Sequence, residues 1–212
     1  GGVTYLDEGP ARLVPGGVEV GGRRITAPKV IVATGGRPAV PDIPGIQDAP
    51  TLDSTSLLEL DRLPESLIFL GGGYIGVELA QMMARMGTRV TIVCRSRLLP
   101  RTEPEVSRAL TETLRAEGVA VVDGATYDAA RRDGARAVLT VTVDGADRDL
   151  TADRLVLTTG RAANTEGLGL AEMGVETDAR GAIRVGDDMQ TTKAGIFAAG
   201  DCTTVPYKQI VI

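Results

Sequence analysis

A glycine-rich segment between two apolar runs constrains the fold of this chain more than any other feature. Residues 66–95 read as an apolar strand, the pattern Gly71-x-Gly73-x-x-Gly76, a helix that begins at Ile75, and a second strand. Gly71 permits a tight turn, Gly73 lets the backbone approach a pyrophosphate, and Gly76 lets the helix lie close to the sheet. The helix N-terminus offers free N–H groups to phosphate. The pattern predicts a dinucleotide-binding unit; a glycine-rich turn without a ligand is the alternative.

The residues after the second strand indicate which dinucleotide is bound. A site that prefers NAD usually places Asp or Glu about 20 residues beyond the first glycine, where it accepts a hydrogen bond from the ribose 2′-hydroxyl. Here Arg95, Arg97 and Arg101 occupy that region and no acid is present. Arg binds phosphate bidentately and keeps its charge, so the sequence favours NADPH, with NADH possible. The alternative is a solvated basic loop whose arginines pair with Glu103 or Glu105.

Composition excludes several classes of function. The net charge of −5 argues against a nucleic-acid partner, and no apolar run among the 212 residues approaches membrane-spanning length. Histidine is absent, which excludes a His general base, a His-containing triad and a His-containing metal site. The two cysteines, Cys94 and Cys202, predict a cytoplasmic protein with inert thiols rather than a secreted domain with disulfides. No metal site is expected.

The chain shows signs of two related domains. A hairpin is expected around Gly21-Gly22, followed by a buried strand over residues 29–34 and a proline-rich crossing over residues 38–50. A nucleotide-binding unit then runs from about residue 67 to residue 160. Three stretches share an apolar strand that ends in Gly, namely residues 29–35, 154–160 and 195–200. This repetition predicts two nucleotide-binding domains of similar construction, one of them incomplete.

Within the nucleotide-binding unit the patterns predict individual elements. The first helix runs from Ile75 to Met86, with an apolar stripe of Ile75, Leu79, Met82, Met83 and Met86 that we expect to pack in the core. A second, amphipathic helix spans residues 103–117, with Gly118 as its end. A strand over residues 119–122 and a β-meander over residues 137–160 complete the unit.

Four motifs resemble, in order and spacing, the flavin-dependent pyridine nucleotide–disulfide oxidoreductases. They are Ala33-Thr-Gly-Gly-Arg-Pro38, Gly71-Gly-Gly-Tyr-Ile-Gly-Val-Glu78, Thr159-Gly-Arg-Ala-Ala-Asn164 and Ala199-Gly-Asp201. Within this family, residues 1 to about 190 look most like the mercuric reductases. The tail, residues 200–209, looks more like the thioredoxin reductases or the flavoprotein subunit of the alkyl hydroperoxide reductases.

The resemblance implies roles for matching residues. Tyr74 would be the gate residue that covers the flavin until the nicotinamide enters, and Glu78 would contact the nicotinamide carboxamide. Arg95 and Arg101 match the two arginines that hold the 2′-phosphate in NADPH-dependent members. The remaining implied contacts are Gly160 and Arg161 with NADPH, and Thr34, Gly35 and Asp201 with FAD.

The chain also departs from the family pattern. It lacks the N-terminal FAD-binding glycine motif, the redox-active cysteine pair and the C-terminal interface domain. The resemblance therefore implies an internal part of a longer, homodimeric flavoenzyme, inactive by itself and doubtful in its retention of FAD. We expect a Rossmann-like three-layer (ββα) NAD(P)H-binding domain at residues 41–161, with parts of an FAD-binding domain at residues 1–40 and 162–212. The implied reaction passes hydride from NADPH through flavin to a cysteine pair, then to Hg(II) or a disulfide. The alternatives are a stand-alone dinucleotide-binding module and a fragment of a dihydrolipoamide dehydrogenase-like or thioredoxin reductase-like enzyme.

Overall fold

The chain forms two compact units, each described below by itself. The computed structural model describes residues 2–205. One unit is continuous, Pro38–Gly160, and the other comprises Gly1–Arg37 and Arg161–Ile212. Part of the tail whose resemblance was noted above, residues 206–209, lies outside the described residues. No helix in the described part of the chain is long and apolar enough to cross a membrane.

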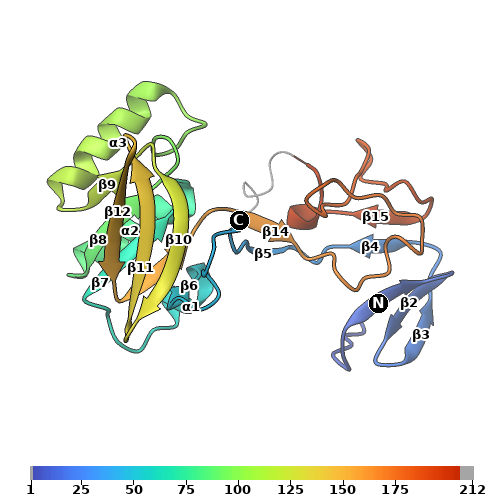
Figure 1. Cartoon of the computed structure of the whole chain (residues 1–212). Coiled ribbons are helices and arrows are strands. Elements are labelled where there is room, and N and C mark those ends of the chain that lie inside the picture. The colour runs from blue at the N-terminus through green and yellow to red at the C-terminus, as the bar shows by residue number, and fades with distance from the viewer. Residues whose placement is uncertain (1, 206–212) are drawn as a thin grey trace. The chain divides into compact units, whose positions relative to one another are not determined.

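A parallel sheet forms the centre of the continuous unit (Figure 1). Its strand order is β6-β13-β7-β8-β9, and every neighbouring pair is parallel. The strands are β6 (Thr51–Leu52), β7 (Ser66–Leu70), β8 (Arg89–Val93), β9 (Ala120–Val122) and β13 (Arg154–Leu157). All five residues of β7 are buried, as expected for a central strand covered on both faces.

Helices cover one face of this sheet. They are α1 (Ser54–Leu58), α2 (Tyr74–Arg85) and α3 (Pro104–Ala116). One hydrophobic cluster joins Val77, Ala80 and Met83 of α2 to Phe69 of β7 and Leu114 of α3. The sequence predicted both long helices to within one residue at each end.

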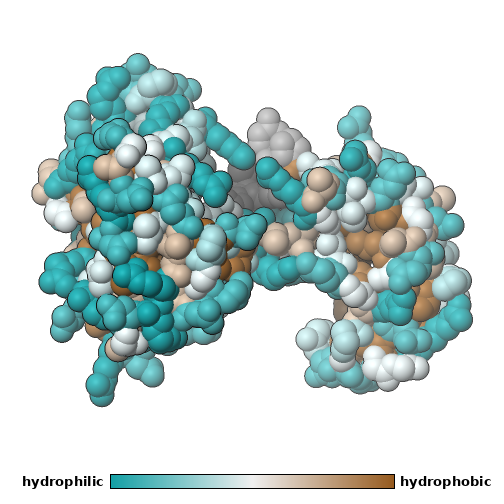
Figure 2. Space-filling view, viewed as in Figure 1, coloured by the Kyte–Doolittle hydropathy of each residue, from teal (hydrophilic) through white to brown (hydrophobic). Residues whose placement is uncertain are grey.

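A three-stranded meander covers the other face, in front of the parallel sheet in Figure 1. Its antiparallel strands are β10 (Thr126–Asp133), β11 (Arg136–Val143) and β12 (Ala146–Ala152). A second cluster packs Leu139 and Val141 of β11 against Ile68, Leu70 and Leu155 of the sheet. The outward face of the meander carries polar side chains and is mostly hydrophilic in Figure 2. The predicted three-layer (ββα) architecture is therefore confirmed.

The two ends of the continuous unit lie together. Ala39 N–H donates to the Gly160 carbonyl oxygen at 3.0 Å, and the Thr159 hydroxyl donates to the Ala39 carbonyl oxygen at 3.4 Å. The chain thus enters and leaves this unit at one place.

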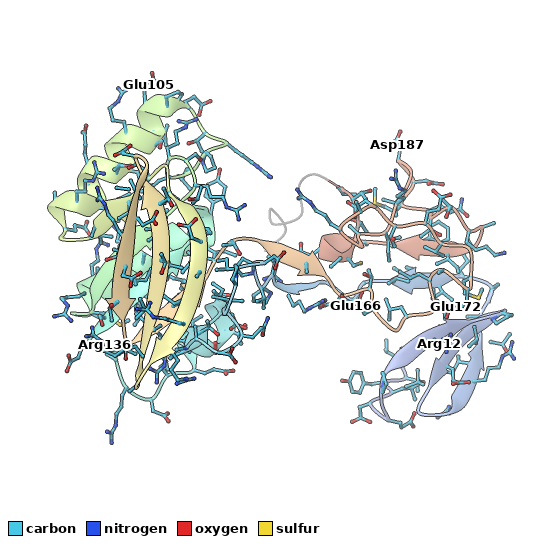
Figure 3. All side chains as sticks on the ribbon, in the orientation of Figure 1. Arg12, Glu105, Arg136, Glu166, Glu172 and Asp187 are labelled. Atoms are coloured by element: carbon cyan, nitrogen blue, oxygen red, sulfur yellow. The ribbon has the colours of Figure 1, made fainter. Side chains whose placement is uncertain are left out.

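The discontinuous unit contains short strands around a small core. They are the antiparallel β1 (Ala11–Val14), β2 (Gly17–Val20) and β3 (Arg23–Thr26), the parallel pair β4 (Val30–Val32) and β15 (Ile196–Ala198), and the pair β5 (Gly36–Pro38) and β14 (Arg161–Ala163). A 3₁₀ turn follows at Gly200–Cys202. The core joins Leu13, Val32, Ile183, Ile196 and Cys202. Figure 3 shows Arg12 and Glu172 side by side, where they form an ion pair of 2.6 Å.

Two local expectations were wrong, and one strand was missed. The strand at residues 30–32 is only partly buried, since Ile31 is 69% exposed. The apolar stripe of α2 does not extend to its end, since Met86 is 46% exposed while Met83 is fully buried. Met86 caps the helix one residue before Gly87, where φ is 101° and the chain turns into β8. The strand β10 was not predicted at all.

Candidate functional site

The strand order reverses at β7, which fixes where a ligand would bind. The chain runs from β7 through α2 to β8 and through α3 to β9 on one side, while β13 lies on the other side of β7. In open parallel sheets, ligands bind at the carboxyl ends of the strands beside such a switch point. The glycine turn follows β7 and residues 158–160 follow β13, so both segments border this position. The Thr158 hydroxyl donates to the Leu70 carbonyl oxygen at 2.9 Å and ties the two strand ends together.

The three glycines of the motif differ in the space around them. A Cβ atom at Gly71, where φ is 110°, would lie 2.5 Å from the Thr158 carbonyl oxygen. A Cβ at Gly76 would lie 2.4 Å from the Gly71 carbonyl oxygen and 2.7 Å from Thr158 Oγ1. A Cβ at Gly73 would meet no atom within 4 Å. Packing within the protein therefore leaves no room for a side chain at Gly71 or Gly76, while the space at Gly73 is open.

The N-terminus of α2 points its free groups toward this open space. Gly73 is the N-cap residue, with extended backbone, and no side chain caps the helix. The first N–H groups of a helix have no partner within the helix, and the dipole adds partial positive charge there. The site thus offers what a pyrophosphate requires, which is backbone donors without a side chain in the way. Tyr74, 56% exposed, and Glu78, also exposed, lie on the first turns of α2.

The loop between β8 and α3 is attached to the glycine turn. Leu99 has a positive φ of 45°, and its N–H donates to the Gly72 carbonyl oxygen at 2.7 Å. The buried Leu98 leaves no room beside Gly72, where a Cβ would lie 3.0 Å from Leu98 Cδ2. The Ser107 hydroxyl of α3 donates to the Leu98 carbonyl oxygen at 2.6 Å. The loop that carries the three arginines is therefore fixed relative to the turn.

The three arginines of this loop have different surroundings. Arg97 Nη2 donates to the carbonyl oxygens of Pro100 at 3.2 Å and Thr102 at 2.7 Å, and its Nη1 is buried without a partner among the described residues. Arg95 is exposed, with its guanidinium 5.2 Å from the ring centroid of Tyr127. Arg101 is exposed. Arg97 thus stabilises the conformation of the loop, and Arg95 and Arg101 remain accessible to a ligand.

The ion pairs of the alternative interpretation do not form in the described part of the chain. None of the three arginines lies within ion-pair distance of Glu103 or Glu105 there. Figure 3 places Glu105 on the helix α3, where it occupies the first turn. An acid in that turn interacts favourably with the helix dipole, which accounts for its presence without an arginine partner.

The residues assigned by resemblance to FAD lie in the discontinuous unit. The Thr34 hydroxyl donates to the Asn164 carbonyl oxygen at 2.6 Å, and the Asn164 N–H donates to the Gly35 carbonyl oxygen at 3.0 Å. Asp201 accepts a hydrogen bond from Arg161 Nε at 3.1 Å. Arg161 also donates to the Gly36 carbonyl oxygen.

Gly160 and Arg161 were both expected to contact NADPH, yet they belong to different units. Gly160, with φ of 144°, ends the continuous unit. Arg161 begins β14 in the other unit, where Asp201 holds its side chain. The contact of Arg161 with NADPH stays a prediction.

The two cysteines are buried and belong to different units. Cys94 follows β8 and its thiol donates to the Ser96 carbonyl oxygen at 3.2 Å. Burial, and secondarily the charge of Asp123, raises the pKa of the Cys94 thiol to about 11. Cys202 donates to the Ala199 carbonyl oxygen at 3.2 Å. The thiol of Cys94 is therefore protonated, and unreactive, at neutral pH.

The raised pKa of Cys94 predicts a loss of stability in alkali. The folded-state pKa of the Cys94 thiol exceeds the ordinary thiol value. The contribution of the buried, protonated thiol to the free energy of unfolding is therefore complete below about pH 8.5, and it declines as the pH rises toward 11. Urea unfolding of the wild type and of Cys94→Ala at pH 7, 9 and 10.5 checks this. We expect the difference between the two free energies of unfolding to shrink by about 2 kcal/mol over this range. A constant difference would contradict the assignment.

Sequence reasoning missed three residues that shape this site. Thr158 meets both Gly71 and Gly76, Leu99 anchors the arginine loop, and Tyr127 lies under Arg95. The Thr-Thr-Gly ending of β13 was visible in the sequence, but its contact with the glycine turn was not. Leu99 and Tyr127 gave no local signal.

A cavity of about 260 Å³ opens at the amino ends of β7 and β8, beside β12. It is lined in part by Ser66, Arg89, Thr91 and Thr151. It lies at the opposite end of the strands from the glycine turn and is separate from the candidate site there.

Comparison with known proteins gives a consistent result. The family model described as pyridine nucleotide-disulphide oxidoreductase matches residues 1–211. A mercuric reductase of Bacillus cereus is 42% identical over 190 residues, which cover 89% of this chain and 30% of that protein. A mercuric reductase of Streptomyces lividans is 42% identical over 182 residues, 86% of this chain and 38% of the relative. The chain thus spans about a third of the length of these curated relatives.

A solved structure agrees with the sequence comparison. The HOCl-induced flavoprotein disulfide reductase RclA from Escherichia coli superposes with a TM-score of 0.83 at 35% identity, covering 92% of this chain and 45% of that one. The predicted resemblance is confirmed: the chain belongs to the pyridine nucleotide–disulphide oxidoreductase family, whose members use FAD and NAD(P)H.

Proposed function

We propose that this chain is the NADPH-binding portion of an FAD-dependent reductase whose reaction carries hydride from NADPH through flavin to a cysteine pair, and then to Hg(II) or a disulfide. The observation that carries the proposal is the open space at Gly73, in front of an uncapped helix N-terminus at the switch point of the sheet. The mercuric reductase relatives support Hg(II) as the final acceptor, and the RclA neighbour supports a disulfide.

The residues present fit the dinucleotide at its phosphates. The N–H groups at the start of α2 would hold the pyrophosphate, and Arg95 and Arg101 would hold the 2′-phosphate. Tyr74 would be the gate residue that covers the flavin until the nicotinamide enters, and Glu78 would accept a hydrogen bond from the nicotinamide carboxamide. NADPH, when bound, supplies a hydride, so the task of these residues is binding and orientation.

The fit to FAD rests on fewer residues. Thr34 and Gly35 are held by Asn164, and Asp201 by Arg161, so these positions are fixed. The sequence supplies no second Gly-x-Gly-x-x-Gly turn for the flavin pyrophosphate. We therefore propose that FAD needs the rest of the parent enzyme, and that this chain alone does not turn over.

Calorimetric titration with NADPH and NADH at one ionic strength tests the function. We expect NADPH to bind more tightly, and Arg95→Ala with Arg101→Ala to weaken NADPH binding about thirtyfold, because charged hydrogen bonds to phosphate are lost. NADH binding should change less than about twofold, because NADH lacks the 2′-phosphate.

A matched control removes the same charge elsewhere. Arg62 and Arg108 are exposed and form no ion pair in the described part of the chain, so the double change to alanine should leave both affinities unaltered. Equal binding of NADPH and NADH by the wild type would contradict the arginine assignment. Absence of binding by both would contradict the proposed function.

A further inference from the structure

Tyr127 joins two parts of the nucleotide site that are far apart in the sequence. It lies on β10, in the meander, while Arg95 follows β8 and Gly71 follows β7. Its ring lies 5.2 Å from the Arg95 guanidinium, and its hydroxyl donates to the Val93 carbonyl oxygen at 2.8 Å. The same carbonyl oxygen accepts from the Gly71 N–H at 2.8 Å.

We propose that Tyr127 is a positioning residue for dinucleotide selection: its ring holds Arg95 ready for a 2′-phosphate, and its hydroxyl fixes the carbonyl that anchors the glycine turn. This inference rests on the proposed function and adds to it a residue that strengthens the NADPH preference.

The ring has a clear physical effect on Arg95. An exposed arginine with no ion pair among the described residues samples many rotamers, and binding a phosphate costs the entropy of ordering it. A guanidinium over an aromatic face is attracted by the ring quadrupole. The ring thus restricts Arg95 before the ligand arrives, and part of the ordering cost is removed from binding.

The hydroxyl acts on a different group. Burial raises the pKa of Tyr127 above its ordinary value, so the hydroxyl remains a donor throughout the neutral range. Its bond and that of Gly71 N–H share one acceptor at the last residue of β8. The hydroxyl therefore stabilises the turn, whichever dinucleotide binds. The ring packs against the hydrophobic cluster of the meander and, within the nucleotide site, acts on Arg95.

These two roles separate in two kinds of variant. Tyr127→Phe keeps the ring and removes the hydroxyl bond, so we expect both affinities to fall by a similar small factor and the NADPH to NADH ratio to stay as in the wild type. Tyr127→Leu and Tyr127→Met remove the ring. We expect them to bind NADPH about threefold to fivefold more weakly than Tyr127→Phe does, and to bind NADH with the same affinity as Tyr127→Phe. In an Arg95→Ala background, loss of the ring should no longer change the ratio.

The measurement is titration of the whole chain with NADPH and NADH, at a temperature where each variant is folded by circular dichroism. An unchanged ratio in a folded Leu or Met variant would overturn this inference and leave the proposed function intact. If the ratio of NADPH to NADH affinity falls as far in Tyr127→Phe as in the Leu and Met variants, the inference is overturned too. Failure of the wild type to bind either dinucleotide would overturn both.

Discussion

Gly71→Ala is expected to lower the free energy of unfolding of the continuous unit by about 3 kcal/mol or more. An alanine would have to adopt φ of 110°, a region that L side chains rarely occupy, and its Cβ would lie 2.5 Å from the Thr158 carbonyl oxygen. Neither the end of β13 nor the turn has freedom to move, because Gly71 N–H is bound to Val93 and Thr158 to Leu70. Urea unfolding followed by circular dichroism measures this loss.

Two further variants serve as graded controls. Gly76→Ala meets similar obstruction but gains about 1 kcal/mol of helix propensity, so a smaller loss of stability is expected. Gly73→Ser places a Cβ where no atom lies within 4 Å and should not destabilise the fold. If Gly71→Ala proves as stable as Gly73→Ser, the packing account of the turn is wrong.

Gly73→Asp should have opposite effects on stability and on binding. Aspartate is a good N-cap and its charge suits the helix dipole, so we expect the free energy of unfolding to rise by about 0.5 kcal/mol. The same carboxylate would stand where the pyrophosphate approaches and would bind the free N–H groups in its place. We expect NADPH and NADH affinity to fall by about 100-fold or more, through repulsion and lost donors.

Calorimetry with both dinucleotides, together with thermal unfolding, checks this pair of effects. Gly73→Ser separates charge from bulk, since it caps the helix without adding a carboxylate, and its binding should fall by a smaller factor than that of Gly73→Asp. Retention of wild-type affinity by Gly73→Asp would show that the helix N-terminus does not receive the phosphates, and would remove the main support for the proposed function.

Much of the fold could be predicted because it follows strong periodic signals. The glycine motif lies between a fully buried strand and an amphipathic helix, so β7, α2 and β8 were predicted in the right order within residues 66–95, and α2 to within one residue. The strand β10 was missed because its inward positions are Tyr127 and the small Ala130, and most of the rest of its sequence is polar. Short alanine side chains fit closely packed layers but give no strand signal.

The candidate site, too, could be predicted from the sequence only in part. The packing roles of Gly71 and Gly76 could be predicted because a short motif carries its own geometry, and the approach of a pyrophosphate to Gly73 stays a prediction. The role of Arg97 could not, since its partners are backbone carbonyl oxygens that the sequence does not distinguish. The contact between Arg95 and Tyr127 depends on how the meander packs on the sheet, which is information that only the folded chain holds.

The hydrogen bond between Ala39 and Gly160 also bears on how such a domain can be inherited. A segment whose first and last residues are a hydrogen bond apart can be placed in a loop of a host protein with little cost in loop entropy. Residues 38–160 therefore form a unit that could be inserted into another protein. A gene segment for them could move between host proteins, or be circularly permuted, without breaking a strand of the parallel sheet. On the proposed function, recombination at these two positions would exchange the electron-donor specificity of the parent reductase in one step.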